Sequence, residues 1–250
     1  MRDILLVVTP CRNAESSLEQ TILSVVQQRG NFEIYYHVQD GGSTDGTLGI
    51  ATKWIELLHD SDGRLHGGAQ VHMSWDSRPD ESMYDAIQTG FESLHRKLEA
   101  PDDRRIVMTW INADDVFAAG AFKAAMTFLG ESADRHWVTG IPSTITEDGM
   151  IADVRDSPHA YSRRQLALGW YDGRGRPFFQ QEGTFWTFSL WVAAGGLNRR
   201  LKLAGDWDLW RRMARETGVA TVRAVLAHHR RRAGQLSADL GPYWSEVGAL

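Results

Sequence analysis

Acidic and glycine residues gather directly after an apolar segment near the start of the chain. Residues 32–38 are rich in β-branched and aromatic side chains and predict a strand, and the stretch Val38–Thr47 (VQDGGSTDGT) follows it. Open α/β sheets bind ligands at the carboxyl ends of their strands, and here a carboxylate and a tight glycine-rich turn follow such an end. The pattern therefore indicates a nucleotide site at Asp40. The alternative is an ordinary loop that leads to a helix, with Ser43, Thr44 or Asp45 as the cap.

Carboxylates recur at two further element boundaries. Asp114 and Asp115 follow an apolar segment, and Asp206 and Asp208 precede an amphipathic one. A reaction on a nucleotide diphosphate needs a divalent cation to neutralise the phosphates, and hard cations prefer carboxylate ligands. Asp114 suits that role. Each of these acids is also a common helix cap, so the convergence of the acidic loops is stronger evidence than any one of them.

Composition excludes several classes of protein. The 250 residues include 42% hydrophobic and 24% charged side chains, and the formal net charge is −5. That charge gives no general attraction to nucleic acid, so we expect no nucleic-acid partner. The one cysteine, Cys11, permits no intramolecular disulfide, which fits a reducing compartment. The apolar run at residues 4–8 is too short for a signal peptide or a membrane span, so we expect a cytoplasmic protein.

Strand and helix patterns alternate through the first half of the chain. Strands are predicted at residues 4–8, 32–38, 70–75 and 104–111, and helical apolar stripes lie between them. Ser16 and Glu19 have the spacing of a capping box. This order predicts an α/β fold, Rossmann-like, with a mostly parallel central sheet flanked by helices. We expect one domain, 1–250.

The second half of the chain is less regular. It predicts a strand at 136–141, a hairpin at 147–149, a strand-like segment at 177–186, a helix from about 203–210 and a last strand at 220–226. We expect this half to build the wall that receives a second substrate.

Several segments, in order, resemble the motifs of inverting GT-A glycosyltransferases of family two, which use nucleotide-diphospho-sugars. The resemblance runs through most of the sequence. Its segments are Thr9-Pro10-x-x-Asn13, Gln39–Thr47, Ser82–Gly90, Asn112–Asp115 at the place of the Asp-x-Asp metal motif, and Gln180–Trp186 and Gly205–Trp210 at the acceptor-side and catalytic-base segments.

The resemblance implies a GT-A fold in which residues 1–115 bind the nucleotide-sugar and 116–250 bind the acceptor. Asp114 then ligates Mn2+ or Mg2+, and Asp206 is the general base that takes the acceptor hydroxyl proton. The implied donor-binding residues are Thr9, Pro10, Asn13, Asp40, Gly41, Ser43, Asp85, Asn112 and Ala113, with Asp40 on the base. The implied acceptor-binding residues are Gln181, Glu182 and Trp207.

The basic cluster His228–Arg232 has two readings. Because the following Gly234–Ser237 also resembles a family pattern near the active site, His228 is a candidate metal or phosphate contact. A solvated basic turn is the alternative. The cluster also leaves open a peripheral contact with the inner face of the membrane.

Other candidate residues have structural alternatives too. Asp206 could cap a helix that buries Trp207 and Trp210, and Asp85 could form a satisfied polar pair with Tyr84. Gln181 and Glu182 could form the polar face of a strand. Trp186 and Trp207 could stack on sugars, but large aromatic residues more often lie in the core.

The expected function is metal-dependent, inverting transfer of a sugar to a hydroxyl of a glycan or lipid-linked acceptor, in bacterial-type polysaccharide synthesis. Many relatives carry Asp where this chain has Asn112, and Glu where it has Gly205. These two departures motivate the alternative of a catalytically degenerate nucleotide-sugar-binding protein. A nicotinamide oxidoreductase is disfavoured because no Gly-x-Gly-x-x-Gly follows a strand.

Overall fold

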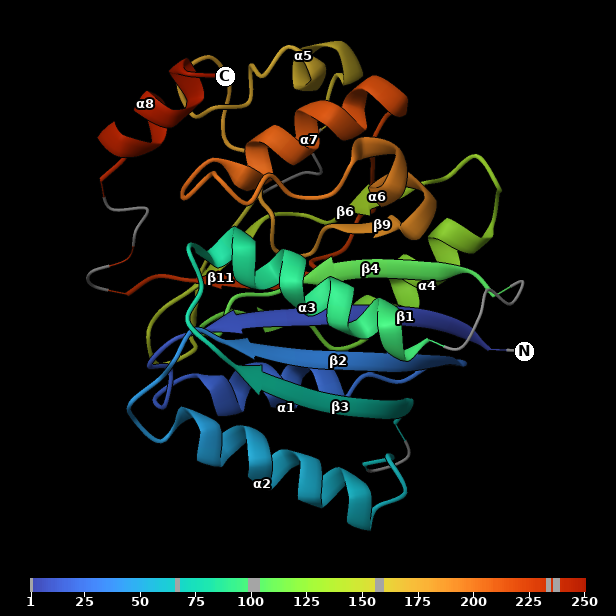
Figure 1. Ribbon diagram of the computed structural model, residues 1–250. Coiled ribbons are helices and arrows are strands. Elements are labelled where there is room, and N and C mark those ends of the chain that lie inside the picture. The colour runs from blue at the N-terminus through green and yellow to red at the C-terminus, as the bar shows by residue number, and fades with distance from the viewer. Residues whose placement is uncertain (1, 66–67, 99–103, 156–159, 233–234, 236–238) are drawn as a thin grey trace.

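A seven-stranded sheet forms the centre of the protein in the computed structural model (Figure 1), which describes residues 2–65, 68–98, 104–155, 160–232, 235 and 239–250. The strand order is β10-β6-β9-β4-β1-β2-β3. β9 runs antiparallel to β4 and β6, and the other pairings are parallel, so the predicted mostly parallel α/β sheet is confirmed. The strands are β1 (Asp3–Cys11), β2 (Phe32–Asp40), β3 (Gln70–Ser77), β4 (Ile106–Trp110), β6 (Trp137–Thr139), β9 (Phe185–Thr187) and β10 (Ala220–Thr221).

Helices pack on both faces of this sheet, because side chains alternate along β1. Leu5 and Val7 lie in one core cluster, with residues of the first, second and fourth helices, and Ile4, Leu6 and Val8 lie in another, with residues of the third, sixth and seventh. The helices are α1 (Leu18–Val26), α2 (Thr47–Asp60), α3 (Met83–Lys97), α4 (Ala121–Gly130), α5 (Arg163–Ala167), α6 (Phe188–Ala194), α7 (Gly205–Glu216) and α8 (Gly241–Gly248). Among the described residues, no helix has the length and apolar character that a membrane crossing requires.

A second, four-stranded sheet joins distant parts of the chain. Its strands, in order, are β5 (Val116–Phe117), β11 (Ala227–Arg230), β7 (Ser143–Ile145) and β8 (Ile151–Val154). β11 pairs antiparallel with β5 and parallel with β7. This sheet brings the basic cluster beside the Asn112–Asp115 loop, although more than a hundred residues separate them in the sequence.

Several predicted element boundaries were wrong. α1 begins at Leu18, one residue after Ser17, and no side chain caps it, so the capping box at Ser16 does not form. The strand expected at 220–226 is replaced by β10 and β11, because the segment between them crosses from one sheet to the other: Ala224 and Leu226 carbonyls accept N–H bonds from Ile141 and Ala118. Within 177–186 the strand begins only at Phe185.

The carboxyl ends of four central strands meet at one edge of the sheet, here named the site edge. Cys11 is in register with Asp40, and Asp40 with Ser77, and each is the last residue of its strand. Ile111, directly after β4, donates its N–H to Val8 of β1. The loops predicted to do chemistry therefore meet at the site edge.

Candidate active site

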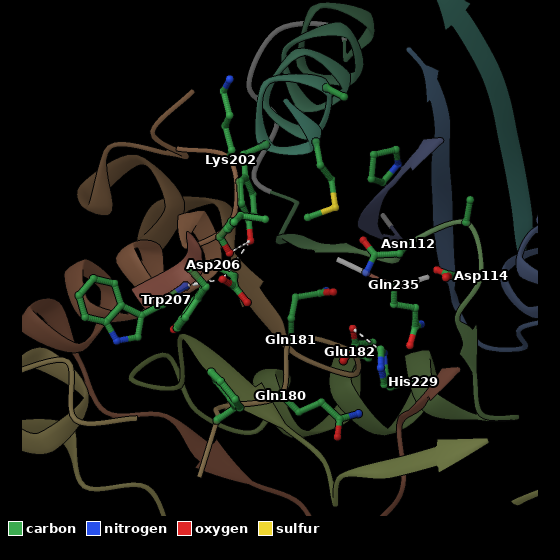
Figure 2. A pocket seen from close by; sticks show the side chains of 18 of the residues that line it. Asn112, Asp114, Gln180, Gln181, Glu182, Lys202, Asp206, Trp207, His229 and Gln235 are labelled. Atoms are coloured by element: carbon green, nitrogen blue, oxygen red, sulfur yellow. Dashed lines mark hydrogen bonds and ion pairs between the residues drawn. The ribbon is translucent and has the colours of Figure 1, made fainter. Parts of the chain in front are cut away.

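A cleft of about 760 Å3 opens at the site edge and is lined from both halves of the chain. Figure 2 shows Asp206 and Trp207 on one side, Asn112 and Asp114 on the other, and Glu182 between them. The structure thus brings together many of the residues that the sequence predicted. Those that line the cleft are Pro10, Asn13, Asn112, Ala113, Asp114, Gln181, Glu182, Asp206 and Trp207.

Asp206 lies in the first turn of α7 and is anchored through one carboxylate oxygen. Its Oδ1 accepts the Tyr84 hydroxyl at 3.0 Å and the Trp207 N–H at 2.7 Å. Burial raises the pKa of Asp206 to about 6, and the negative charge of Glu182 adds to the rise, while the two hydrogen bonds oppose it. A carboxylate with a pKa near neutrality is suited to general-base chemistry.

Gly205 stands where many relatives carry Glu, and the structure gives a physical reason. A Cβ atom at this position would lie 2.5 Å from the Tyr84 ring. The ring approaches closely because its hydroxyl donates to both Asp206 and the Leu203 carbonyl. Glycine at 205 therefore leaves room for the ring of Tyr84, whose hydroxyl orients Asp206.

The loop Asn112–Asp115 directs polar groups toward the cleft. Asp114 Oδ2 pairs with Arg232 Nε at 2.6 Å, and Asp115 Oδ2 accepts the Asn112 side-chain amide at 3.2 Å. Asn112 Oδ1 is buried and has no hydrogen-bond partner among the described residues. An unpartnered buried oxygen beside a carboxylate that lines the cleft fits the donor set of a hard divalent cation.

His229 joins this loop to the second half of the chain. Its Nδ1 lies 3.5 Å from Asp115 Oδ1 and 3.7 Å from Glu182 Oε1. Hydrogen bonds to these two carboxylates raise the pKa of His229 to about 10, which favours its protonated form. The ligand atoms of Asp115, Glu182 and His229 all lie within 4.8 Å of one another, so the group could also hold a metal ion.

His228 does not line the cleft. Adjacent residues of a strand face opposite ways, and His228 Nδ1 instead lies 2.8 Å from Ser143 Oγ. The structure thus moves the metal hypothesis from His228 to His229. The sequence would have identified His229 only if the strand β11 had been predicted with its register.

Asp40 is buried and bonded within its own turn. It accepts hydrogen bonds from the N–H groups of Gly42 (3.0 Å) and Ser43 (2.9 Å), the Ser43 hydroxyl and the Ser77 hydroxyl (2.6 Å). Although burial alone would raise the pKa of Asp40, these bonds hold it below its usual value. Asp40 orders the glycine-rich loop, and its contact with a nucleotide base stays a prediction.

Other predicted donor-binding residues also lie outside the cleft lining. The Thr9 hydroxyl accepts a bond from the Tyr36 hydroxyl at 3.0 Å, and Asp85 forms an ion pair with Arg199. Gly41 and Ser43 lie in the turn that Asp40 organises, and Gly41 donates its N–H to the Cys11 carbonyl. Donor binding by these residues stays a prediction.

Several cleft residues were missed from the sequence. Arg12, Asp80 and Tyr84 lie within or beside the predicted motifs, so their neighbourhood pointed to them. The aromatic residues Tyr171 and Tyr243 carried no comparable pattern. Gln235 also lines the cleft, whereas the remaining residues of the Gly234–Ser237 pattern lie outside the described part of the chain.

Comparisons with known proteins agree with the fold. The fold resembles that of TarS of S. aureus (TM-score 0.65, 13% identity), over 98% of this chain and 38% of that one. A TarS structure with UDP-GlcNAc matches with a TM-score of 0.65 and 14% identity, over 96% of this chain and 61% of that one. The mannosyltransferase PcManGT from Pyrobaculum calidifontis, in complex with GDP-Man and Mn2+, matches with a TM-score of 0.64 and 16% identity, over 99% of this chain and 62% of that one.

The chain thus spans less than two thirds of the length of these structural relatives. No curated protein matches its sequence significantly. The model of the family "Glycosyl transferase family 2" matches residues 6–172, more than half of the chain. The predicted GT-A fold is therefore confirmed, and this chain belongs to glycosyl transferase family 2.

Proposed function

We propose that this glycosyltransferase moves a sugar, with inversion, from a nucleotide-diphospho-sugar to a hydroxyl of a saccharide or lipid-linked saccharide in polysaccharide synthesis. The observation that carries the proposal is Asp206. Its carboxylate faces the cleft across from the Asn112–Asp115 loop and has a pKa raised to about 6. In direct displacement, Asp206 takes the proton of the acceptor oxygen as that oxygen attacks the anomeric carbon.

The donor is proposed to lie against the half formed by residues 1–115. Pro10, Asn13, Asn112 and Ala113 line the cleft on that side. Asn13 Oδ1 also accepts the Thr44 N–H at 2.9 Å, which joins the first loop to the glycine-rich loop. The solved structures of TarS with UDP-GlcNAc and of PcManGT with GDP-Man support a nucleotide-sugar as the donor class.

A divalent cation, Mn2+ or Mg2+, is proposed to bind beside Asp114. Asp114 supplies a carboxylate, Asn112 an unpartnered oxygen, and Glu182 and His229 further ligand atoms. The Mn2+ in the PcManGT complex supports this assignment. When bound, the cation neutralises the departing diphosphate. Arg232 already brings positive charge to the same wall of the cleft.

The acceptor is proposed to lie against the half formed by residues 116–250. Gln181 and Glu182 offer polar groups, and the largely buried aromatic side chains Tyr171, Trp207 and Tyr243 line the same side of the cleft. Trp207 Nε1 donates to the Gly169 carbonyl at 3.0 Å, so its ring orientation is fixed. A cytoplasmic location and a membrane contact through the basic cluster stay predictions.

The decisive test replaces Asp206 by Asn, with Asp208→Asn as the matched control. Both residues lie in the first turn of α7, but Asp208 pairs with Arg212 at 2.8 Å. Asp206→Asn should lower kcat for transfer by at least about a hundredfold while donor affinity is retained, because the proton acceptor is lost. Asp208→Asn should lower kcat less than about threefold, since an ion pair of this kind stabilises little. Equal rates for the two variants would remove Asp206 from the base role.

A donor screen by thermal shift precedes that test. UDP, GDP, dTDP, their sugar conjugates and NAD are each added with Mn2+ and with a chelator, because a ligand of the folded state raises its stability. We expect one nucleotide to shift Tm only with the metal. A metal-dependent shift without turnover on any acceptor would favour the nucleotide-sugar-binding alternative, and a shift with NAD would favour an oxidoreductase.

A further inference from the structure

The last helix of the chain, α8, packs near the start of α7, on the same side of the molecule as the site edge (Figure 1). Tyr243 of α8 is buried in a small cluster with Ala204 and Trp207, apart from the two main cores. Trp244 Nε1 donates to the Asp172 carbonyl at 3.1 Å. The helix thus contacts the segment that leads directly to Asp206.

Glu246 of α8 bonds three consecutive backbone N–H groups of that segment. Its Oε1 accepts the N–H of Lys202, and its Oε2 accepts those of Leu203 and Ala204, each at 2.7 Å. N–H groups at the start of a helix have no partner within the helix, and a carboxylate there is favoured by the helix dipole. Hydrogen bonds to a charged acceptor are about twice as strong as neutral ones.

The same segment forms a wall of the cleft. Lys202 and Leu203 line the cleft beside Asp206, Tyr243 lines it from α8, and Leu240 lines it from the position directly before α8. The segment is anchored from two sides, because the Leu203 carbonyl accepts the Tyr84 hydroxyl that also bonds Asp206. Tyr84 fixes its inner side, and Glu246 fixes its outer side.

We propose that Glu246 is a positioning residue: it holds the Lys202–Ala204 segment against α8 and thereby completes the acceptor end of the cleft. This inference depends on the proposed function, since it assumes that Asp206 receives an acceptor hydroxyl. The donor-side residues Asn13, Asn112 and Asp114 have no contact with Glu246 among the described interactions. Loss of Glu246 therefore affects the acceptor far more than the donor.

The test compares Glu246→Ala and Glu246→Gln, with Ser245→Ala on the exposed side of the same helix as the control. We expect Glu246→Ala to raise the acceptor KM at least about tenfold and to leave the donor KM within about twofold, because small displacements near reacting groups are costly. Glu246→Gln should lie between it and the wild type, since one amide oxygen still accepts from Leu203 and Ala204. Ser245→Ala should match the wild type.

Hydrogen exchange at the Lys202, Leu203 and Ala204 amides gives a readout that needs no turnover. Exchange there should accelerate at least about tenfold in Glu246→Ala and remain unchanged in Ser245→Ala. If exchange accelerates in Glu246→Ala but the wild type transfers no sugar, the proposed function is contradicted. The anchoring of the segment by Glu246 is then still supported. Unchanged exchange, or an equal rise of donor and acceptor KM, would overturn the role of Glu246.

Discussion

Asp206 combines two opposing influences within one carboxylate. The Tyr84 hydroxyl and the Trp207 N–H both bond Oδ1, which fixes the orientation of the group and favours its charged form. Burial and the charge of Glu182 favour the protonated form and prevail, so the pKa rises to about 6. The group is oriented and remains basic enough to accept a proton near neutral pH.

The activity should therefore depend on pH in the mildly acidic range. Transfer needs the deprotonated carboxylate, so kcat should fall as the pH decreases through about 6. Tyr84→Phe removes a hydrogen bond that stabilises the charged form of Asp206. The pH at which kcat falls should therefore rise by roughly 0.5–1 unit. The measurement is kcat against pH at saturating donor, metal and acceptor. If kcat of Tyr84→Phe falls at the same pH as kcat of the wild type, the pH dependence does not arise from Asp206.

The raised pKa of Asp206 also makes the free energy of unfolding depend on pH. Because folding raises the pKa of Asp206 above its ordinary value of 3.8, the folded state binds more protons between about pH 4 and pH 6. Stability contributed by the protonated group is present at low pH and is lost as the pH rises through about 6. Asp206→Asn should raise the free energy of unfolding at pH 8 by roughly 1–3 kcal/mol and change it little at pH 4. Urea titration of the variant and the wild type at pH 8 and at pH 4 measures these free energies of unfolding.

At the scale of elements, β11 supplies an arginine, Arg230, that joins α1 and the second sheet to the Asn112–Asp115 loop. Arg230 is 3% exposed, and its guanidinium donates to the carbonyls of Asp114 and Glu147 and to Gln20 Oε1, each at 2.7 Å. Its backbone N–H bonds Asp115 at 2.7 Å. One side chain thus ties α1, the β7–β8 hairpin and the Asn112–Asp115 loop together.

Removal of that guanidinium should destabilise the protein. Arg230→Met leaves buried carbonyl groups without donors, so we expect a loss of about 2–5 kcal/mol in the free energy of unfolding. Arg231→Met is the matched control, because Arg231 is exposed on the neighbouring position, and it should change stability by less than about 0.5 kcal/mol. Equal urea midpoints for the two variants would contradict the stabilising role of Arg230.

At the scale of the whole molecule, a layer of tryptophans lies beneath the acceptor side of the cleft. Trp110 and Trp210 stack with ring centroids 5.7 Å apart, and Trp137 and Trp186 complete the buried group. Trp186, which the sequence left open as a sugar platform, is fully buried in this core. The layer supports α7 and the segment that precedes it.

Truncation within this layer should be costly. Trp137→Ala should lower the free energy of unfolding by about 3–5 kcal/mol, because a large buried side chain is replaced by a cavity. Trp170→Ala is the control, since that ring is 49% exposed, and it should cost less than about 1 kcal/mol. Chemical denaturation followed by circular dichroism measures both.

The sequence by itself determined the order of elements in the first half and the placement of the acidic loops. Those features depend on local periodicity and on turn chemistry, in which interacting residues lie a few positions apart, as Asp40, Gly42 and Ser43 do. Parallel pairing of the strands brings the loops after β2 and β4 to one edge, so Asp40, Asn112 and Asp114 were predictable at the same edge of the sheet. The place of Asp206 across the cleft was expected only from the family resemblance.

Only the tertiary structure decided how those residues are held. It turned His229, and not His228, toward the cleft, and it paired Asp85 with Arg199, 114 positions away. It also brought Glu246 to the amides before α7, 42 to 44 positions away. Such pairs depend on how loops close and elements pack across long stretches of chain, and no local pattern encodes them.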